Sequence, residues 1–391
     1  MNNKPVFDYP LFAMGFRAFF ALAGLSALMF IALWNAVSNS SLHLANYFPD
    51  TIWHAHEMLL GYSAAVIAGF LLTAVRNWTG RQTVNPDQLA GLSLLWIYGR
   101  VAPFYAGVLP DGLIAGVDFA FLPALAYFAG KPVLKTGDFK NLIFVALLLL
   151  MALANGLVHA QMLGLTENSA YTGLNLMVAL IVLMIVLIAG RIFPFFTERG
   201  LSGVICIRNP ALDMVAVGVS LAVFALLLFG VSGAILAVAA LAALVVNSLR
   251  IAGWYDGRIW FVPLLWVLFV GYGWIILGFG LLALSAFSLV APTLALHAFT
   301  VGGIGVLTLG MMARVALGHT GRPLKTSNLM AIAFLLINLA ALCRVLFPAL
   351  LPSWYNGFVL VSSYSWLAAF SLFLQYYAPI LASRRADGQA G

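Results

Sequence analysis

The sequence has 391 residues, of which 63% are hydrophobic and only 8% are charged, and its formal net charge at pH 7 is +7. A soluble domain carries about a quarter charged residues, so this composition excludes a water-exposed surface and makes lipid the main solvent. Apolar runs of about 20 residues recur along the chain, which is the length that a helix needs to cross a bilayer.

These runs predict an all-α, polytopic transmembrane helical bundle of about twelve helices, forming a single domain over residues 1–391. The fourth run is short and contains Pro123, so it is the least regular. No compelling internal repeat is expected. In chain order, the expected spans are 12–34, 53–75, 88–107, 111–129, 140–162, 171–190, 209–229, 232–249, 260–284, 293–313, 327–348 and 354–380.

The positions of the basic residues test this count of spans independently. With the N-terminus in the cytoplasm, 17 of the 19 Lys and Arg residues fall in cytoplasmic segments. This distribution follows the positive-inside rule, so we expect both termini in the cytoplasm. It also explains the net charge as an orientation signal, so no nucleic-acid partner is expected. The 17 residues are Lys4, Arg17, Arg76, Arg81, Lys131, Lys135, Lys140, Arg191, Arg199, Arg208, Arg250, Arg258, Arg314, Arg322, Lys325, Arg384 and Arg385.

The two cysteines exclude some redox chemistry. In this topology Cys206 and Cys343 fall near opposite faces, so we expect no disulfide. Neither lies in a C-x-x-C or C-x-x-C-H motif, which argues against covalently bound c-type haem.

Four histidines from three spans are expected at one depth near the outer face. His54 and His56 open the second span, His159 lies near the end of the fifth, and His297 lies near the start of the tenth. Imidazole is the commonest metal ligand, and helical bundles build such sites from facing helices at a common depth. We therefore predict a metal or haem site with these four histidines as ligands. The alternative is a polar network or proton path between helices.

The pair His54 and His56 lies next to an acid. Residues two apart on a helix point ~200° away from each other, so both cannot bind one metal unless the turn is distorted. His56 is deeper, so we expect it to be the principal ligand. Glu57 could orient a histidine, bind copper or deliver protons.

Two arginines lie in the outer halves of apolar spans, namely Arg100 in the third and Arg344 in the eleventh. A cation inside the membrane is costly and usually faces a partner in the bundle interior. We expect Arg100 to be buried and paired. Snorkelling to the outer surface is the alternative for both, and Arg344 is the better candidate for it.

The chain resembles the NnrS family, bacterial inner-membrane proteins associated with nitric oxide stress and denitrification. The resemblance implies twelve helices, bound haem b and copper, and a role in relieving nitric oxide toxicity. It is carried by residues 12–20, 53–62, 69–74, 77–80, Trp96, Gly99, Arg100, His159, 297–314 and 318–322.

Together these observations predict a haem and copper protein of the bacterial inner membrane that binds and detoxifies nitric oxide near the periplasmic face. If it is an enzyme, it is an oxidoreductase for 2 NO + 2 e⁻ + 2 H⁺ → N₂O + H₂O, with electrons from a donor that the sequence does not identify. Glu57 would then pass protons, and Arg100 would pair with a haem propionate or stabilise negative charge.

The expected haem ligands are among His56, His159 and His297, with Arg100 and Arg344 as further cofactor-binding residues. His54 then serves copper or a surrounding position. Two other functions remain open. One is a non-catalytic haem protein that senses nitric oxide or carries electrons, and the other is a transporter.

Overall fold

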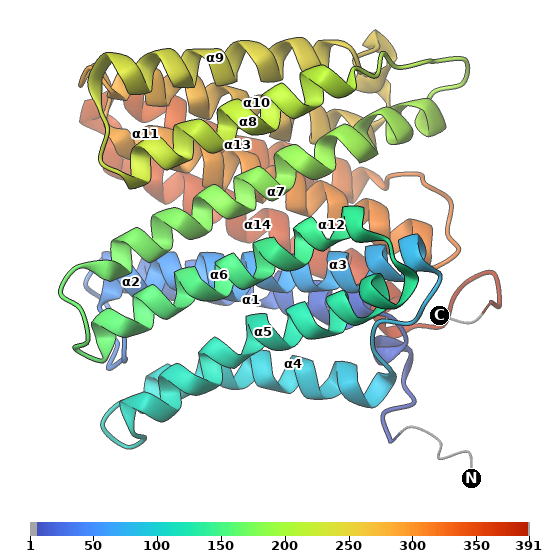
Figure 1. Ribbon diagram of the computed structural model, residues 1–391, viewed down its shortest axis with the longest axis horizontal. Coiled ribbons are helices and arrows are strands. Elements are labelled where there is room, and N and C mark those ends of the chain that lie inside the picture. The colour runs from blue at the N-terminus through green and yellow to red at the C-terminus, as the bar shows by residue number, and fades with distance from the viewer. Residues whose placement is uncertain (1–5, 390–391) are drawn as a thin grey trace. The chain divides into compact units, whose positions relative to one another are not determined.

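The computed structural model describes residues 6–389, and this part of the chain contains helices and no β-strand. The all-α prediction is therefore confirmed, and twelve long helical segments follow in the order of the expected spans (Figure 1). The second and tenth segments each contain a π-helix between two α-helices. The elements of these segments are α1 (Gly15–Ser38), α2 (Asp50–His56), η2 (Glu57–Ser63), α3 (Ala64–Thr79), α4 (Pro86–Val101), α5 (Asp111–Thr136), α6 (Leu142–Met162), α7 (Ser169–Gly200), α8 (Pro210–Leu228), α9 (Gly233–Ala252), α10 (Pro263–Ser285), α11 (Pro292–His297), η6 (Ala298–Gly305), α12 (Val306–His319), α13 (Asn328–Leu350) and α14 (Tyr355–Ala382).

Eleven of the described segments are long and apolar enough to cross a membrane. The remaining one, α4, has 16 residues and ends at Val101, short of the expected end at residue 107. From Ala102 the chain continues as a 3-10 helix, η3 (Ala102–Tyr105), because Pro103 has no N–H group to donate the α-helical hydrogen bond to the carbonyl oxygen of Gly99. In contrast, α5 continues through Pro123 for 26 residues, so the fourth span is a long helix. Neighbouring helices in a membrane protein often tolerate such a proline.

The chain divides into two compact units. Unit 1 consists of residues 1–177, 312–324 and 373–391, and unit 2 consists of residues 178–311 and 325–372. Both cysteines lie in unit 2 and are free, which confirms that they form no disulfide. That the two units make up one domain stays a prediction.

In unit 1, the start of α1 meets the end of α14. The guanidinium of Arg17 is fully buried, and its Nη1 donates hydrogen bonds to the carbonyl oxygens of Leu381 (2.9 Å) and Ser383 (2.6 Å). A cation is favourable there because the last carbonyl groups of a helix have no partner within the helix. The first and last helices therefore begin and end on the same side of unit 1. That this side is cytoplasmic stays a prediction.

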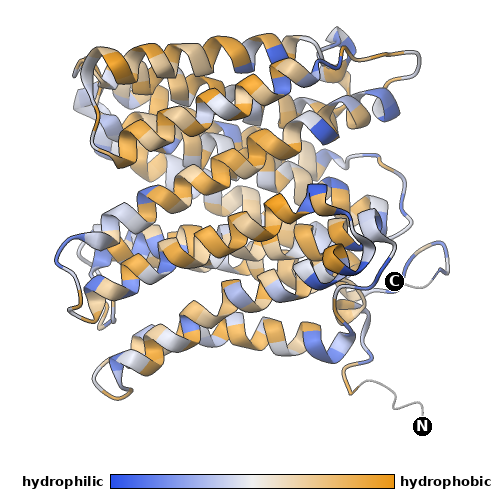
Figure 2. Ribbon diagram, in the orientation of Figure 1, coloured by the Kyte–Doolittle hydropathy of each residue, from blue (hydrophilic) through white to orange (hydrophobic). Residues whose placement is uncertain are grey.

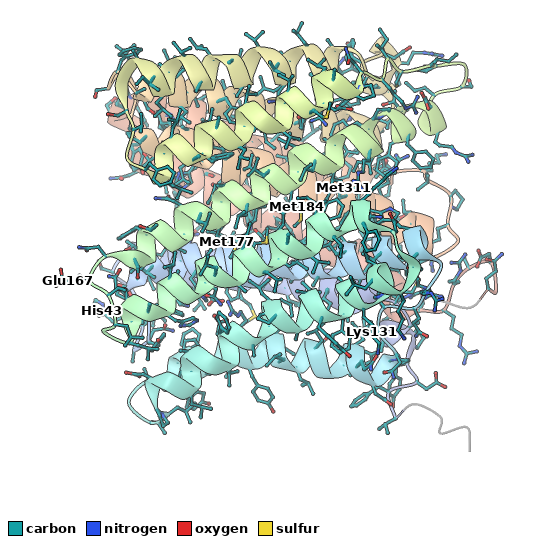
Figure 3. The ribbon with its side chains drawn as sticks, in the orientation of Figure 1. His43, Lys131, Glu167, Met177, Met184 and Met311 are labelled. Atoms are coloured by element: carbon teal, nitrogen blue, oxygen red, sulfur yellow. The ribbon has the colours of Figure 1, made fainter. Side chains whose placement is uncertain are left out.

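The distribution of polar residues agrees with helices that cross a bilayer. Hydrophilic residues gather at helix ends and in loops, whereas the middles of the helices are mainly hydrophobic (Figure 2). Figure 3 places His43 and Glu167 at one end of the unit 1 helices and Lys131 at the other end. The expected topology requires this separation, since it assigns Lys131 to the cytoplasm and His43 to the first outer loop. Lys4 lies outside the described residues.

Candidate metal centre

The helix that carries His56 changes its winding directly after this residue. α2 ends at His56, and the next seven residues, Glu57–Ser63, form the π-helix η2. Gly61 lies within it, where an added Cβ atom would approach the ring of Phe30 in α1 to 2.5 Å. π-helical turns are rare and occur frequently at functional sites.

His54 and His56 point toward different neighbours, as their offset on a helix predicts. The ring of His54 stacks on the ring of Trp34 in α1, with centroids 4.3 Å apart and an interplanar angle of 15°. The ring of His56 is fully buried and faces α5 and α6. His56 therefore joins the polar cluster described next, whereas His54 contacts α1.

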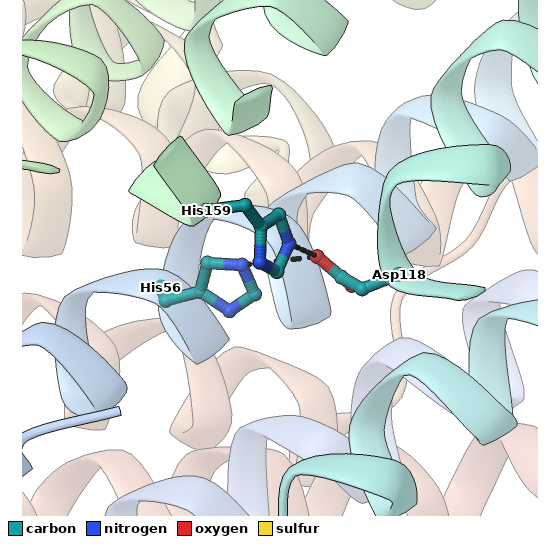
Figure 4. Close-up of side chains that lie close together, drawn as sticks. All are labelled: His56, Asp118 and His159. Carbon is teal, nitrogen blue, oxygen red and sulfur yellow. Dashed lines mark hydrogen bonds and ion pairs between the residues drawn. The ribbon is translucent and has the colours of Figure 1, made fainter. Parts of the chain in front are cut away.

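Three side chains from three segments meet in the interior of unit 1 (Figure 4). Asp118 of α5 lies between the two imidazoles, and its Oδ2 atom is 3.2 Å from His56 Nε2 and 2.7 Å from His159 Nε2. The exposed fractions of His56, Asp118 and His159 are 0%, 2% and 3%. One potential ligand atom from each residue lies within 4.8 Å of the other two.

These separations suit a transition-metal ion. Imidazole nitrogens bind zinc at about 2.0–2.1 Å, so neighbouring ligand atoms lie roughly 3.0–3.4 Å apart around an octahedral or tetrahedral ion. The distances from Asp118 Oδ2 to His56 Nε2 and His159 Nε2 require only small adjustments to reach this range. Two imidazoles and one carboxylate form a ligand set that copper, iron and zinc accept.

The hydrogen bonds around His56 place an oxygen acceptor beside each of its ring nitrogens. Nδ1 of His56 donates to Glu57 Oε1 at 3.1 Å. Nε2 faces two acceptors, Asp118 Oδ2 and Asn155 Oδ1, each at 3.2 Å. The amide of Asn155 is oriented by its own donation to Asp118 Oδ2, at 2.9 Å. A proton or a metal ion at His56 Nε2 satisfies all of these groups.

The predicted burial and pairing of Arg100 are both observed. Its guanidinium is 7% exposed, donates from Nη1 to Glu57 Oε1 at 3.0 Å, and forms a second ion pair with Asp118. Its partners in the structure are thus two carboxylates of the chain. With Glu57 and Asp118 ionised and the imidazoles neutral, the centre has one more negative than positive charge, which favours binding of a cation.

Asp118 is the residue that the sequence analysis missed. It lies in an apolar stretch of α5, and an ionisable residue inside a membrane helix is by itself a sign of a functional site. Gly99 of α4 makes room for it, because an added Cβ atom there would come within 3.0 Å of Asp118 Oδ1. No histidine lies next to Asp118 in the sequence, so the depths of the histidines give no sign of it.

The loop between α1 and α2 covers the centre. The ring of Phe48 packs on His56 with centroids 4.3 Å apart, and Tyr47 OH lies 3.4 Å from His159 Nδ1. Burial, together with the charge of Asp111, raises the pKa of Tyr47 to about 12. The phenol is therefore protonated at physiological pH. With Nε2 of His159 on a metal ion, Nδ1 would carry the ring proton and donate to the Tyr47 hydroxyl oxygen.

The other predicted site residues lie in unit 2. His297 is the last residue of α11, and its Nδ1 lies 2.7 Å from the carbonyl oxygen of Thr293. Arg344 lies in α13, with its guanidinium 5.7 Å from the centre of the Tyr355 ring. The structure thus brings together His56, His159, Glu57 and Arg100 in unit 1. The roles of all seven predicted residues, His54 included, stay predictions.

A comparison with family models identifies the family. Residues 10–385, nearly the whole chain, match the model described as NnrS protein. The chain belongs to the NnrS family. No curated protein matches it. Membership of the NnrS family and eleven potential membrane-spanning helices together indicate a multi-pass membrane protein with a role in the response to nitric oxide.

Proposed function

We propose that this NnrS protein binds copper at His56, Asp118 and His159, also holds haem, and reduces nitric oxide to N₂O in the bacterial inner membrane. The observation that carries the proposal is the convergence of three potential metal ligands, from three helices, in the apolar interior of unit 1. Burying two carboxylates there is expensive unless they serve a cation or a reaction.

The geometry favours a metal ion over haem iron at this cluster. Both histidine Nε2 atoms approach the same oxygen of Asp118, at 3.2 and 2.7 Å. A haem bound between His56 and His159 would have to displace this carboxylate, whereas a single ion uses it as a third ligand. The proposal therefore assigns His56 and His159 to copper and leaves haem iron to ligands elsewhere.

The residues around the cluster suit the reduction 2 NO + 2 e⁻ + 2 H⁺ → N₂O + H₂O. Nitric oxide is small and apolar, so it can reach a buried centre through lipid. When bound, copper and haem iron supply the redox chemistry and the positions at which nitric oxide binds. Oε2 of Glu57 is buried and has no hydrogen-bond partner among the described residues, and the proposal assigns the passage of protons to this oxygen. The charge of Arg100 stabilises negative charge that develops nearby.

The test measures copper in purified protein. Asp118→Asn keeps the shape of the side chain but removes its charge, so the affinity of the protein for copper should fall about 10- to 100-fold. The matched control is Asp213→Asn in unit 2, because Asp213 of α8 also pairs with a buried arginine, Arg250. This control should keep the copper content of the wild type. Full copper in Asp118→Asn would rule out the proposed centre.

Gas chromatography of the reaction with a chemical reductant separates the candidate activities. N₂O formed in proportion to nitric oxide consumed supports a reductase. Binding of nitric oxide that changes the optical spectrum without N₂O would instead indicate a sensor or an electron carrier. The natural electron donor is then sought by its ability to reduce the haem.

A further inference from the structure

The helix with the π-helical turn occurs twice in the chain. The second and tenth helical segments of the chain have identical residues at a constant offset of 241, although no repeat was expected from the sequence. The identical pairs are His56 and His297, Gly61 and Gly302, Gly69 and Gly310, Thr79 and Thr320, Gly80 and Gly321, and Arg81 and Arg322.

The local structure repeats with the sequence. In each copy the α-helix ends at the matched histidine and a π-helix begins at the next residue, giving η2 (Glu57–Ser63) and η6 (Ala298–Gly305). The matched glycine in each π-helix lies against an aromatic ring, Phe30 for Gly61 and Trp274 for Gly302. Two rare π-helices at equivalent positions are strong evidence that the two elements are built alike.

The next helix along the chain also repeats its functional residue. α4 carries Arg100 followed by Val101, and α13 carries Arg344 followed by Val345. Within unit 1, α4 packs against η2, and within unit 2, α13 packs against α11 and η6. His297, the last residue of α11, is near the start of the tenth segment, and Arg344 is near the end of α13. Because these neighbouring helices run in opposite directions, the two side chains start at a similar depth.

The two copies differ in their carboxylates. Glu57 in the first copy corresponds to Ala298 in the second, and the sequence contains no Asp or Glu between Asp256 and Asp387. Helices α10 to α14 therefore offer no acid to Arg344. Its Nη1 atom is buried and has no hydrogen-bond partner among the described residues. The guanidinium is half-buried and also contacts the neutral ring of Tyr355, so an anion from outside the chain would supply the negative charge that these helices lack.

The imidazole of His297 has the form that binds a metal. A carbonyl oxygen only accepts hydrogen bonds, so the contact from Nδ1 to the Thr293 oxygen (2.7 Å) places the ring proton on Nδ1. In the neutral ring the lone pair is then on Nε2. A histidine that donates from one nitrogen to a backbone carbonyl and binds metal with the other is a common arrangement.

We propose that the copy in unit 2 binds the haem, with His297 Nε2 on the iron and Arg344 on a propionate, while the copy in unit 1 binds the metal ion. Haem brings its own carboxylates, which unit 2 lacks, whereas a bare metal ion needs the carboxylates that unit 1 supplies. This division of the two cofactors rests on the proposed function, because it assumes that the protein holds haem.

The experiment measures haem and copper separately in the same purified full-length variants. His297→Ala and Arg344→Leu should lower the haem-to-protein ratio, measured as the pyridine haemochrome, and should keep the copper of the wild type. Asp118→Asn should lower the copper content and keep the haem-to-protein ratio of the wild type. Haem affinity should fall about 10- to 100-fold in Arg344→Leu, as expected for the loss of a group that supports a bound cofactor, and recover in Arg344→Lys.

A second variant separates a ligand from a structural residue. His297→Gly leaves space at the helix end, so added imidazole should restore the optical spectrum of bound haem in a concentration-dependent way. Full haem with an unchanged spectrum in His297→Ala, or a failure of imidazole to restore haem in His297→Gly, would overturn the division. If the His297 variants give either of these results but Asp118→Asn still loses copper, only the division of the cofactors is refuted and the proposed function stands. If Asp118→Asn keeps its full copper content, the proposed function itself is refuted.

Discussion

Removing the charge of Arg100 should destabilise unit 1 by an amount that the structure allows us to estimate. Arg100 forms ion pairs with two carboxylates, Glu57 and Asp118, and only 7% of its surface is exposed. Breaking a buried ion pair by removing one partner costs about 3–5 kcal/mol, since the other charge stays buried. We therefore expect Arg100→Leu to lower Tm by roughly 5–10 °C.

The assay is thermal unfolding of protein stripped of metal and haem, followed by tryptophan fluorescence in detergent. Arg344→Leu is the matched control, because no carboxylate of α10 to α14 depends on Arg344 for charge balance. This control should melt at or above the wild-type temperature. Adding copper should recover part of the loss in Arg100→Leu, since the ion replaces the missing positive charge. The reasoning fails if Arg100→Leu melts at the same temperature as Arg344→Leu.

Three further predictions test the packing, the pH dependence and the topology. Gly61→Ala places a Cβ atom against Phe30 and should cost about 1–3 kcal/mol, whereas Gly91→Ala in open space on α4 should be neutral or stabilising in the same unfolding assay. Burial raises the pKa of Tyr47 to about 12, so its contribution to stability is fully present below pH 10 and is lost as the pH rises through about 12. The Tm difference between the wild type and Tyr47→Phe should therefore stay constant below pH 10, and above it the Tm of the wild type should fall relative to that of Tyr47→Phe. A C-terminal alkaline-phosphatase fusion should be inactive and a C-terminal green fluorescent protein fusion should fluoresce, and an active phosphatase would refute the cytoplasmic C-terminus.

The helices were predictable because a helix that crosses lipid needs a run of about 20 apolar residues, and such runs are evident in the sequence. Each long apolar run forms a helix. In the one short segment the α-helix changes to a 3-10 helix at Ala102, because Pro103 has no N–H group to continue the α-helical hydrogen bonds. The opposite outcome at Pro123 was not predictable from the run alone. Whether a proline breaks a membrane helix depends on the neighbouring helices, which a single run does not contain.

The candidate site was predictable in part. The expected depth in the membrane was enough to predict that His56, Glu57, Arg100 and His159 lie close together. Because successive spans run in opposite directions, the position of a residue within its span gives its depth. Asp118 was missed because its immediate neighbours in α5 are apolar and no histidine lies beside it in the sequence.

The π-helices and the repeat were hidden for a different reason. Each π-helix contains a glycine that packs closely against an aromatic ring of another helix, and the spacing of apolar residues in the sequence does not indicate a π-helix. The six identities of the repeat are spread among apolar residues that can replace one another, so the sequence pattern alone does not indicate a repeat. The two π-helices, each preceded by a histidine, do indicate it.

The most direct test of the central claim is X-ray absorption spectroscopy at the copper edge of the purified wild-type protein. The account predicts a first shell of nitrogen and oxygen at about 2.0 Å with the multiple scattering of two imidazoles, and loss of this signal in Asp118→Asn. A first shell that contains sulfur, or a spectrum with two imidazoles that is unchanged in Asp118→Asn, would contradict a centre built from His56, Asp118 and His159.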